Sequence, residues 1–218
     1  MRNNPPKHLK WVFKALSVLI IVKVTVSIVA NYTNYLPPHF DSDFLRGRQD
    51  YFFGTYQWVF YLHIFSGPLV LIMGLVLMSS KFRNQFPAWH QRIGKIQLSS
   101  VIFLVAPTGL WMSCYTANGI FAGIGFATLA LLTGLTAIWG WRTAAQRNFI
   151  DHQGWMWRCY LLLCSAVILR LIGGAGTWIG VETPGFDPFA GWVSWITPLV
   201  VYELTRLIPK VGRVRKID

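Results

Sequence analysis

Charged residues are scarce in this 218-residue chain: they make up 13% of it, and only 8 are Asp or Glu. Cysteine is rarer still, with three residues. Cys114, Cys159 and Cys164 form no CxxC pair, which argues against a disulfide or metal site and favours packing thiols. The sequence also lacks a phosphate loop, a GxGxxG after a strand, an HExxH and a Ser-centred hydrolase elbow. These absences exclude the sites that those motifs build.

What the chain has instead is long apolar runs, with 54% hydrophobic residues, 11 Trp and a mean hydropathy of +0.43. Runs able to cross about 30 Å of hydrocarbon fall at 11–30, 58–79, 96–115, 120–141, 155–174 and 192–208. Aromatic residues mark many of their ends, as in an interfacial belt: Trp11, Trp58, Tyr115, Trp141, Trp155 and Trp192. The pattern predicts an all-α, polytopic integral membrane bundle of about six spans, with the second to fifth as a four-helix core.

The net charge of +12 comes from 20 Lys and Arg residues that form short clusters between the apolar runs. This placement reflects topology and not a nucleic-acid surface. The clusters that we assign to the cytoplasm are Arg2, Lys7 and Lys10; Lys81, Arg83, Arg92 and Lys95; Arg142 and Arg147; and Lys210, Arg213, Arg215 and Lys216. Both termini are then cytoplasmic, and the segments around Asp41, Asp43 and Asp50 and around Glu182 and Asp187 face outward.

The N-terminus begins with basic residues like a signal peptide, but Lys23 interrupts its apolar core and no A-x-A-like site follows. We therefore expect an uncleaved first span. The loops are short, so we expect residues 1–218 to form one transmembrane domain. Residues 1–56 hold the first span and an outer loop, 57–176 the four-helix core, and 177–218 an outer loop, the last span and a basic tail. The longest outer segment, 31–57, is the expected lid.

Two cytoplasmic segments are weakly alike: RNQFPAWHQRIGK, ending at Lys95, and QRNFIDHQGWMWR, ending at Arg158. Each places a His-Gln at the entrance of the next helix, so His90 and His152 would lie at one depth if the match is a repeat and not chance. Interfacial contact with lipid phosphates would explain both imidazoles. Alternatively, they are axial ligands of a haem iron, with nearby bases neutralising its propionates. A bound anionic substrate or a partner protein is the third interpretation.

A second polar group is expected in the outer half of the bundle. His63 lies on the second span, followed on roughly the same face by Gly67 and Gly74. Arg170 lies at a similar depth on the antiparallel fifth span. His63, Gly67 and Arg170 could therefore line a pocket for a quinone-like carbonyl or a small anion. The alternatives are that Arg170 snorkels to the interface and that His63 only packs.

One further polar pair lies on the last span, where Glu203 comes three residues before Arg206. This spacing predicts an ion pair within one helix.

The residues HIFSG on the second span, HQRIGK before the third and HQGWMWRCYLLLCSAVILRL on the fifth resemble the bacterial family of predicted membrane proteins called domain of unknown function 2306. That resemblance implies location and architecture but no activity. More distantly, the chain is similar to haem-binding bundles of the cytochrome b561 and ferric-reductase type. It implies a haem b held by His90 and His152, with Arg92, Lys95 and Arg158 close by and His63 as one outer ligand. The fourth span has no histidine, so at most one haem fits.

Three functions remain open. The first is a redox or cofactor-binding protein of the bacterial inner membrane, with a haem at His90 and His152 and a quinone or anion at His63 and Arg170. The second is a non-enzymatic subunit that docks a larger membrane complex through its aromatic belts and basic loops. The third is a small transporter that uses His63, Arg170 and Glu203. Membrane lipids are expected partners in each case, and nucleic acid is not.

Overall fold

The computed structural model describes residues 6–42, 44–180 and 186–207, and within these residues every regular element is helical. The predicted all-α class is therefore confirmed. Five helical stretches are long and apolar enough to cross a membrane: Trp11–Asn34, Thr55–Leu77, Pro87–Ser113, Gly119–Ala145 and Phe149–Trp178. The chain is thus a multi-pass membrane bundle.

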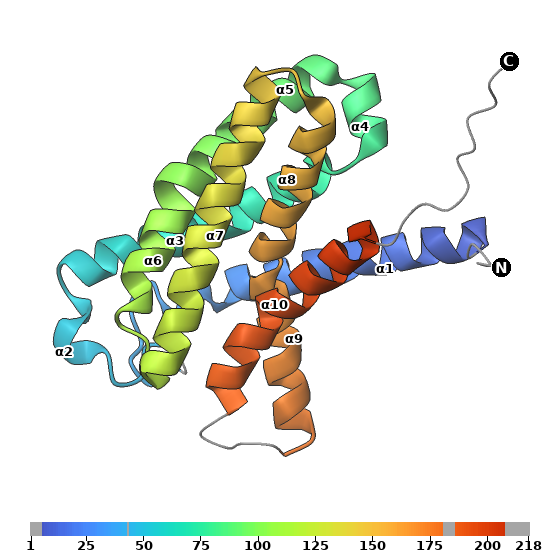
Figure 1. Cartoon of the computed structure of the whole chain (residues 1–218). Helices are drawn as coiled ribbons and strands as arrows, with labels where there is room; N and C mark the ends of the chain where they lie inside the picture. Colours follow the sequence, from blue (N-terminus) through green and yellow to red (C-terminus); the bar gives the residue numbers. More distant parts are fainter. Residues whose placement is uncertain (1–5, 43, 181–185, 208–218) are drawn as a thin grey trace, which may run out of the picture.

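The four-helix core is built from two hairpins (Figure 1). The first joins α3 (Thr55–Leu77) to a helix made of α5 (Pro87–Ser100), the π-helical η2 (Val101–Val105) and α6 (Ala106–Ser113), with the short α4 (Ser80–Gln85) between them. The second joins α7 (Gly119–Ala145) to α8 (Phe149–Leu163) and its continuation α9 (Ser165–Trp178). The main core cluster lies where these helices meet: Val70, Leu71, Leu98, Val101, Val105, Ala137, Cys159, Tyr160, Leu163, Cys164 and Val167.

Two helices pack on the outside of this core. α1 (Lys7–Ala30) runs across the bundle in Figure 1, contacts α3 and α9, and leaves most of its apolar side chains exposed, as a lipid-facing helix does. α10 (Phe186–Leu207) packs against α7, α8 and α9. It is not among the five stretches that are apolar enough to cross a membrane; Glu203 lies within it, and Asp187 and Arg206 lie in its first and last turns. The sixth expected span, 192–208, is thus a helix but is less apolar than the others, and Ile208 lies outside the described residues.

The helices start earlier than the apolar runs predicted. The third spanning stretch begins at Pro87 and not at residue 96, and the fifth at Phe149 and not at 155. The apolar run marks the part that lies in hydrocarbon, while the polar first turns of these helices extend beyond it. Several charged residues used above to assign the topology lie outside the described part: Arg2, Asp43, Glu182, Lys210, Arg213, Arg215 and Lys216.

The segment between α1 and α3 is ordered by aromatic packing. We call it the outer segment, and the end of the bundle next to it the outer end, after the side of the membrane that the sequence predicts for it. It contains η1 (Asn31–Asn34) and α2 (Gln49–Phe52). Leu45, Phe52, Tyr56 and Phe60 form its buried cluster, with Phe44 stacked on Phe60 at a centroid distance of 5.2 Å. The segment therefore packs against the outer end of the bundle through its own small core.

Candidate functional site

A cavity of about 1110 Å³ lies in the outer half of the bundle. Its lining comes from the outer segment with η1, from α3, α6 and the turn after α6, from α7, α8 and α9, and from single residues of α1, η2 and α10. Most of the wall is apolar, as with Phe60, Leu71, Phe126, Leu129 and Leu162. A space of this size, apolar with a few polar groups, is typical of small-molecule sites, which hold roughly 300–1,000 Å³.

His63 is one of those polar groups, and its tautomer follows from its partner. His63 Nδ1 lies 2.9 Å from Thr108 Oγ1, and Thr108 Oγ1 lies 2.5 Å from the carbonyl oxygen of Leu104. Since the hydroxyl has one proton and donates it to the carbonyl, it accepts from Nδ1–H. His63 also makes a backbone hydrogen bond with Val105, which calls for a ring N–H as donor. In the neutral imidazole a proton on Nδ1 leaves Nε2 as an acceptor.

Gly109 explains how the imidazole fits in this place. A methyl group on Gly109 would lie 3.2 Å from His63 Cε1, so the ring rests against the bare backbone of α6. The π-helical turn just before, where the Ala106 N–H bonds to the Val101 carbonyl, widens the helix beside the cavity. Pro107 contributes to this, because it has no N–H for the carbonyl four residues earlier.

A second proline shapes the wall on α3. Pro68 lies inside the helix and lines the cavity with Gly67, and its missing N–H leaves the carbonyl of Ile64 without its helical partner. The hydroxyl of Tyr32 donates to that carbonyl and so attaches η1 to α3. A methyl group on Gly67 would meet nothing within 4 Å, which makes Gly67 an open point of the wall.

Arg170 also lines the cavity. The sequence predicted a similar depth for Arg170 and His63, and the two residues do share this cavity. Its side chain remains exposed and donates from Nη1 to the Ala166 carbonyl at 3.0 Å. It interacts electrostatically with His63, Tyr32 and Tyr35, and none of the described carboxylates pairs with it. The structure thus brings His63, Gly67 and Arg170 to one cavity; whether they bind a ligand stays a prediction.

Arg48 is a residue of this site that no sequence pattern predicted. Arg48 precedes α2 in the outer segment, lines the cavity and is only 7% exposed. Its guanidinium lies 4.4 Å from the centre of the Phe44 ring, donates to the Phe44 carbonyl and interacts with the Tyr56 hydroxyl. Its Nε is buried and has no partner among the described residues.

The two inner histidines lie at equivalent places and close to each other. His90 is the fourth residue of α5 and His152 the fourth of α8, and the two interact electrostatically. His152 Nδ1 donates to the Gly140 carbonyl at 2.8 Å, which leaves its Nε2 as an acceptor. His90 Nδ1 is buried and has no partner among the described residues. Neither histidine lines the cavity.

This donor set fits axial ligation of a haem in two respects. Metal-bound histidines usually donate their other ring N–H to a carbonyl or carboxylate, as His152 does. An orphaned buried nitrogen, as on His90, is a group that a ligand would satisfy.

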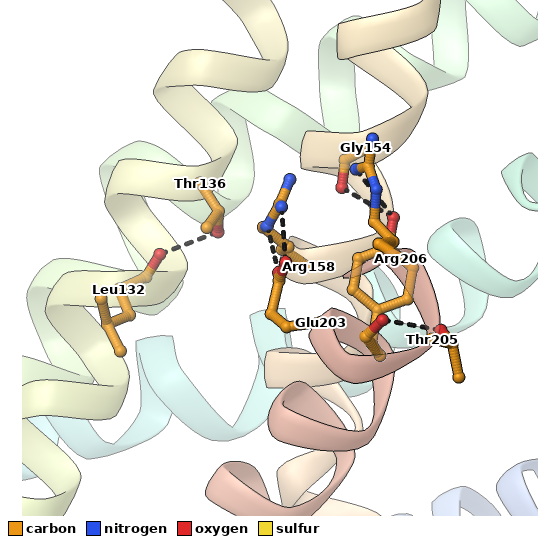
Figure 2. A network of polar contacts seen from close by, with 8 residues as sticks. Leu132, Thr136, Gly154, Arg158, Glu203, Thr205 and Arg206 are labelled. Atoms are coloured by element: carbon orange, nitrogen blue, oxygen red, sulfur yellow. Dashed lines mark hydrogen bonds and ion pairs between the residues drawn. The ribbon is translucent and has the colours of Figure 1, made fainter. Parts of the chain in front are cut away.

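Of the three basic residues predicted near that haem, two are exposed and one is paired with a carboxylate. Arg92 and Lys95 are exposed, and the Arg92 guanidinium lies 5.6 Å from the centre of the Trp89 ring. Arg158 binds Glu203 through two hydrogen bonds of 2.5 and 2.9 Å (Figure 2). Its charge is therefore neutralised by α10.

The ion pair predicted between Glu203 and Arg206 was wrong, because Glu203 bonds across to α8. Arg206 instead approaches Tyr202, whose hydroxyl lies 3.4 Å from the Gly154 carbonyl (Figure 2). Two parallel hydrogen bonds between a carboxylate and a guanidinium on a neighbouring helix are more stabilising than a single contact with an arginine one turn away on the same helix.

Comparison with known proteins agrees with this architecture. The profile of a family described as predicted membrane protein (DUF2306) matches residues 60–206. Since that stretch covers well over half of the chain, the protein belongs to this family, as its residues suggested. No curated protein and no solved structure matches the chain.

Proposed function

We propose that this DUF2306 protein binds an amphipathic small molecule in its outer cavity. The observation that carries the proposal is the cavity itself, about 1110 Å³ with mostly apolar walls and with His63 and Arg170 among its polar groups. A cavity of this kind, with hydrogen-bond donors and acceptors set among apolar walls, suits a ligand with an apolar body and a polar head.

The two polar groups have complementary chemistry. Arg170 can only donate hydrogen bonds, so it would bind a carbonyl oxygen or an anion. His63 presents Nε2 as an acceptor, so it would bind a hydroxyl group or take its proton. A quinone or quinol head group offers both kinds of atom, and so does a small protonated anion.

The test fills the cavity. Gly67→Leu places a side chain at the open point of the wall, where even a methyl group meets nothing within 4 Å. Gly94→Leu is the matched control, because Gly94 also lies in a helix with nothing within 4 Å but does not line the cavity. Each protein is purified in a mild detergent, and its bound small molecules are extracted and identified by mass spectrometry.

We expect the wild type and Gly94→Leu to carry a compound that Gly67→Leu lacks, at equal protein yield and thermal stability. An extract that is identical for all three proteins contradicts the proposal. It would favour the interpretation of the chain as an accessory subunit of a larger membrane complex, to be tested by copurification.

A second candidate is haem binding at the inner end, in the manner of cytochrome b561 bundles. It is supported by the closeness of His90 and His152 and by the orphaned Nδ1 of His90. His90 and His152 would hold the iron of a haem b. When bound, the haem would supply one-electron transfer, and the protein would then be a redox protein that could exchange electrons with a quinone in the cavity.

Optical spectra test this second candidate. The purified protein is recorded oxidised and then reduced with dithionite, from cells supplied with haem precursor. We expect a Soret band that His90→Ala and His152→Ala abolish and that the control His8→Ala, on the exposed start of α1, retains. A folded wild-type protein without this band excludes haem at the pair.

We also propose the orientation in the bacterial inner membrane. Lys81, Arg83, Arg92, Lys95, Arg142 and Arg147 all lie in or beside the inner turns of the two hairpins, which favours a cytoplasmic location for that end and for both termini. The cavity would then face the outer side.

A further inference from the structure

Two guanidinium groups line the outer cavity, and they come from different parts of the chain. Arg170 lies on α9, and Arg48 lies in the outer segment. No described carboxylate pairs with either of them. Asp41 is the acidic residue among the described lining, and it is exposed, so the charge of that lining is net positive.

Arg48 is the more telling of the two. A buried guanidinium costs several kcal/mol, roughly, unless it is paired and hydrogen-bonded. Arg48 is only 7% exposed. Its described partners are the Phe44 carbonyl, the Tyr56 hydroxyl and the Phe44 ring, and all of them are uncharged. Its Nε has no partner among the described residues. Arg48 thus places a desolvated positive charge and a donor without a described partner beside the cavity.

We infer that the ligand of the cavity is an amphipathic molecule with a phosphate head group, held by Arg48 and Arg170. This inference rests on the proposed function and specifies the class of its ligand. The planar fork of arginine matches phosphate oxygens, and two such groups match a head that carries up to two negative charges. The apolar wall around Phe60, Leu71 and Leu129 would take the chain.

A neutral quinone would leave this arrangement unexplained. Its two carbonyl oxygens could accept hydrogen bonds from both arginines, but a neutral head would leave the charges of Arg48 and Arg170 uncompensated. A phosphate with one proton also suits His63, since the phosphate hydroxyl can donate to Nε2.

The experiment compares probes with one chain and different heads. The protein is purified in dodecyl maltoside, whose head is uncharged, and binding of dodecyl phosphate, dodecanoate and dodecanol is measured by calorimetry, with decylubiquinone as the quinone probe. The variants are Arg48→Gln, Arg48→Lys and Arg170→Gln. Arg46→Gln is the matched control, since Arg46 is an exposed arginine of the same segment that does not line the cavity.

We expect dodecyl phosphate to bind at least about tenfold more tightly than dodecanol and more tightly than dodecanoate. Because hydrogen bonds to charged groups are the strong ones, Arg48→Gln and Arg170→Gln should each weaken it by roughly 10- to 100-fold. Arg48→Lys should retain part of the affinity, and Arg46→Gln all of it. Unchanged dodecanol binding in Arg48→Gln would show that the variant is folded.

The outcomes separate this inference from the proposed function. One outcome overturns the phosphate assignment alone: dodecyl phosphate binds no better than dodecanol or dodecanoate, while decylubiquinone binds the wild type and Arg48→Gln equally well and does not bind Gly67→Leu. The proposal that the cavity binds a small molecule would then be retained. If no probe binds and no compound is extracted from the wild type, both fail.

Discussion

The hydroxyl of Thr108 sets the tautomer of His63. It accepts from Nδ1–H at 2.9 Å and donates to its own helix at Leu104. Thr108, itself held by the Leu104 carbonyl, thus orients the His63 ring, and the absence of a side chain on Gly109 leaves space for that ring. The site therefore depends on small residues that carry no charge and that hydropathy does not single out.

Replacing this hydroxyl by a methyl group isolates its effect. Thr108→Val should lower the free energy of unfolding by about 1–3 kcal/mol, because Nδ1–H loses its acceptor in a buried place. Thr128→Val is the control: Thr128 is only partly buried and its hydroxyl bonds to its own helix at Ile124. Thermal unfolding in detergent measures the difference, and ¹⁵N spectra of labelled histidine report the tautomer. Equal stability of the two variants would contradict the assigned hydrogen bond.

At the scale of the helices, the sequence predicted more of the fold than of the site. Long apolar runs place the spans because hydrocarbon tolerates few charges, and the depth of His63 and Arg170 follows from counting along helices. Arg48 could not be placed in this way, since the position of a loop residue depends on tertiary packing, here that of the Phe44 and Tyr56 rings, which hydropathy does not predict. The partner of Glu203 was wrong for the same reason: α8 lies beside α10 only in the folded bundle.

The contact of η1 with α3 gives a prediction about two elements. Tyr32→Phe leaves the Ile64 carbonyl, freed by Pro68, without a partner, and should cost about 1–3 kcal/mol. Pro68→Ala restores an N–H four residues after Ile64. In the double variant the loss from Tyr32→Phe should therefore be smaller, with a coupling of about 0.5–3 kcal/mol in a thermal-unfolding cycle. Additive losses would mean that the phenol does not replace the missing helical bond.

α3 packs closely against α8 at Gly74, where there is no space for a side chain. A methyl group on Gly74 would lie 2.6 Å from Tyr160 Cδ2 and 2.9 Å from Gln97 Nε2, while one on Gly67 meets nothing. Gly74→Ala should thus lower stability by about 1–3 kcal/mol, because the Tyr160 ring is part of the buried core. Gly67→Ala, on the same helix, should be neutral or stabilising by about 0.5–1 kcal/mol. Equal melting temperatures for the two variants would contradict the close approach.

For the whole molecule, the two ends of the bundle carry different chemistry. The outer end holds the cavity, with Arg48, His63 and Arg170, and the inner end holds His90 and His152. Between them lies the packed core cluster around Val70, Val101 and Tyr160. The two ends are therefore separate sites, and each can be tested without the other.

Which end faces the cytoplasm can be measured with the protein's own thiols. Cys114 is exposed beside the outer end of α6, while Cys159 and Cys164 are buried. A membrane-impermeant maleimide added to intact bacterial cells should label Cys114. In the variant Cys114→Ser/Gln146→Cys, whose new thiol lies in the exposed turn between α7 and α8, labelling should require permeabilised cells. We expect this pattern because Arg142 and Arg147 flank that turn, and basic turns stay in the cytoplasm. The reverse pattern would place the cavity towards the cytoplasm, and its ligand would then be drawn from the inner leaflet.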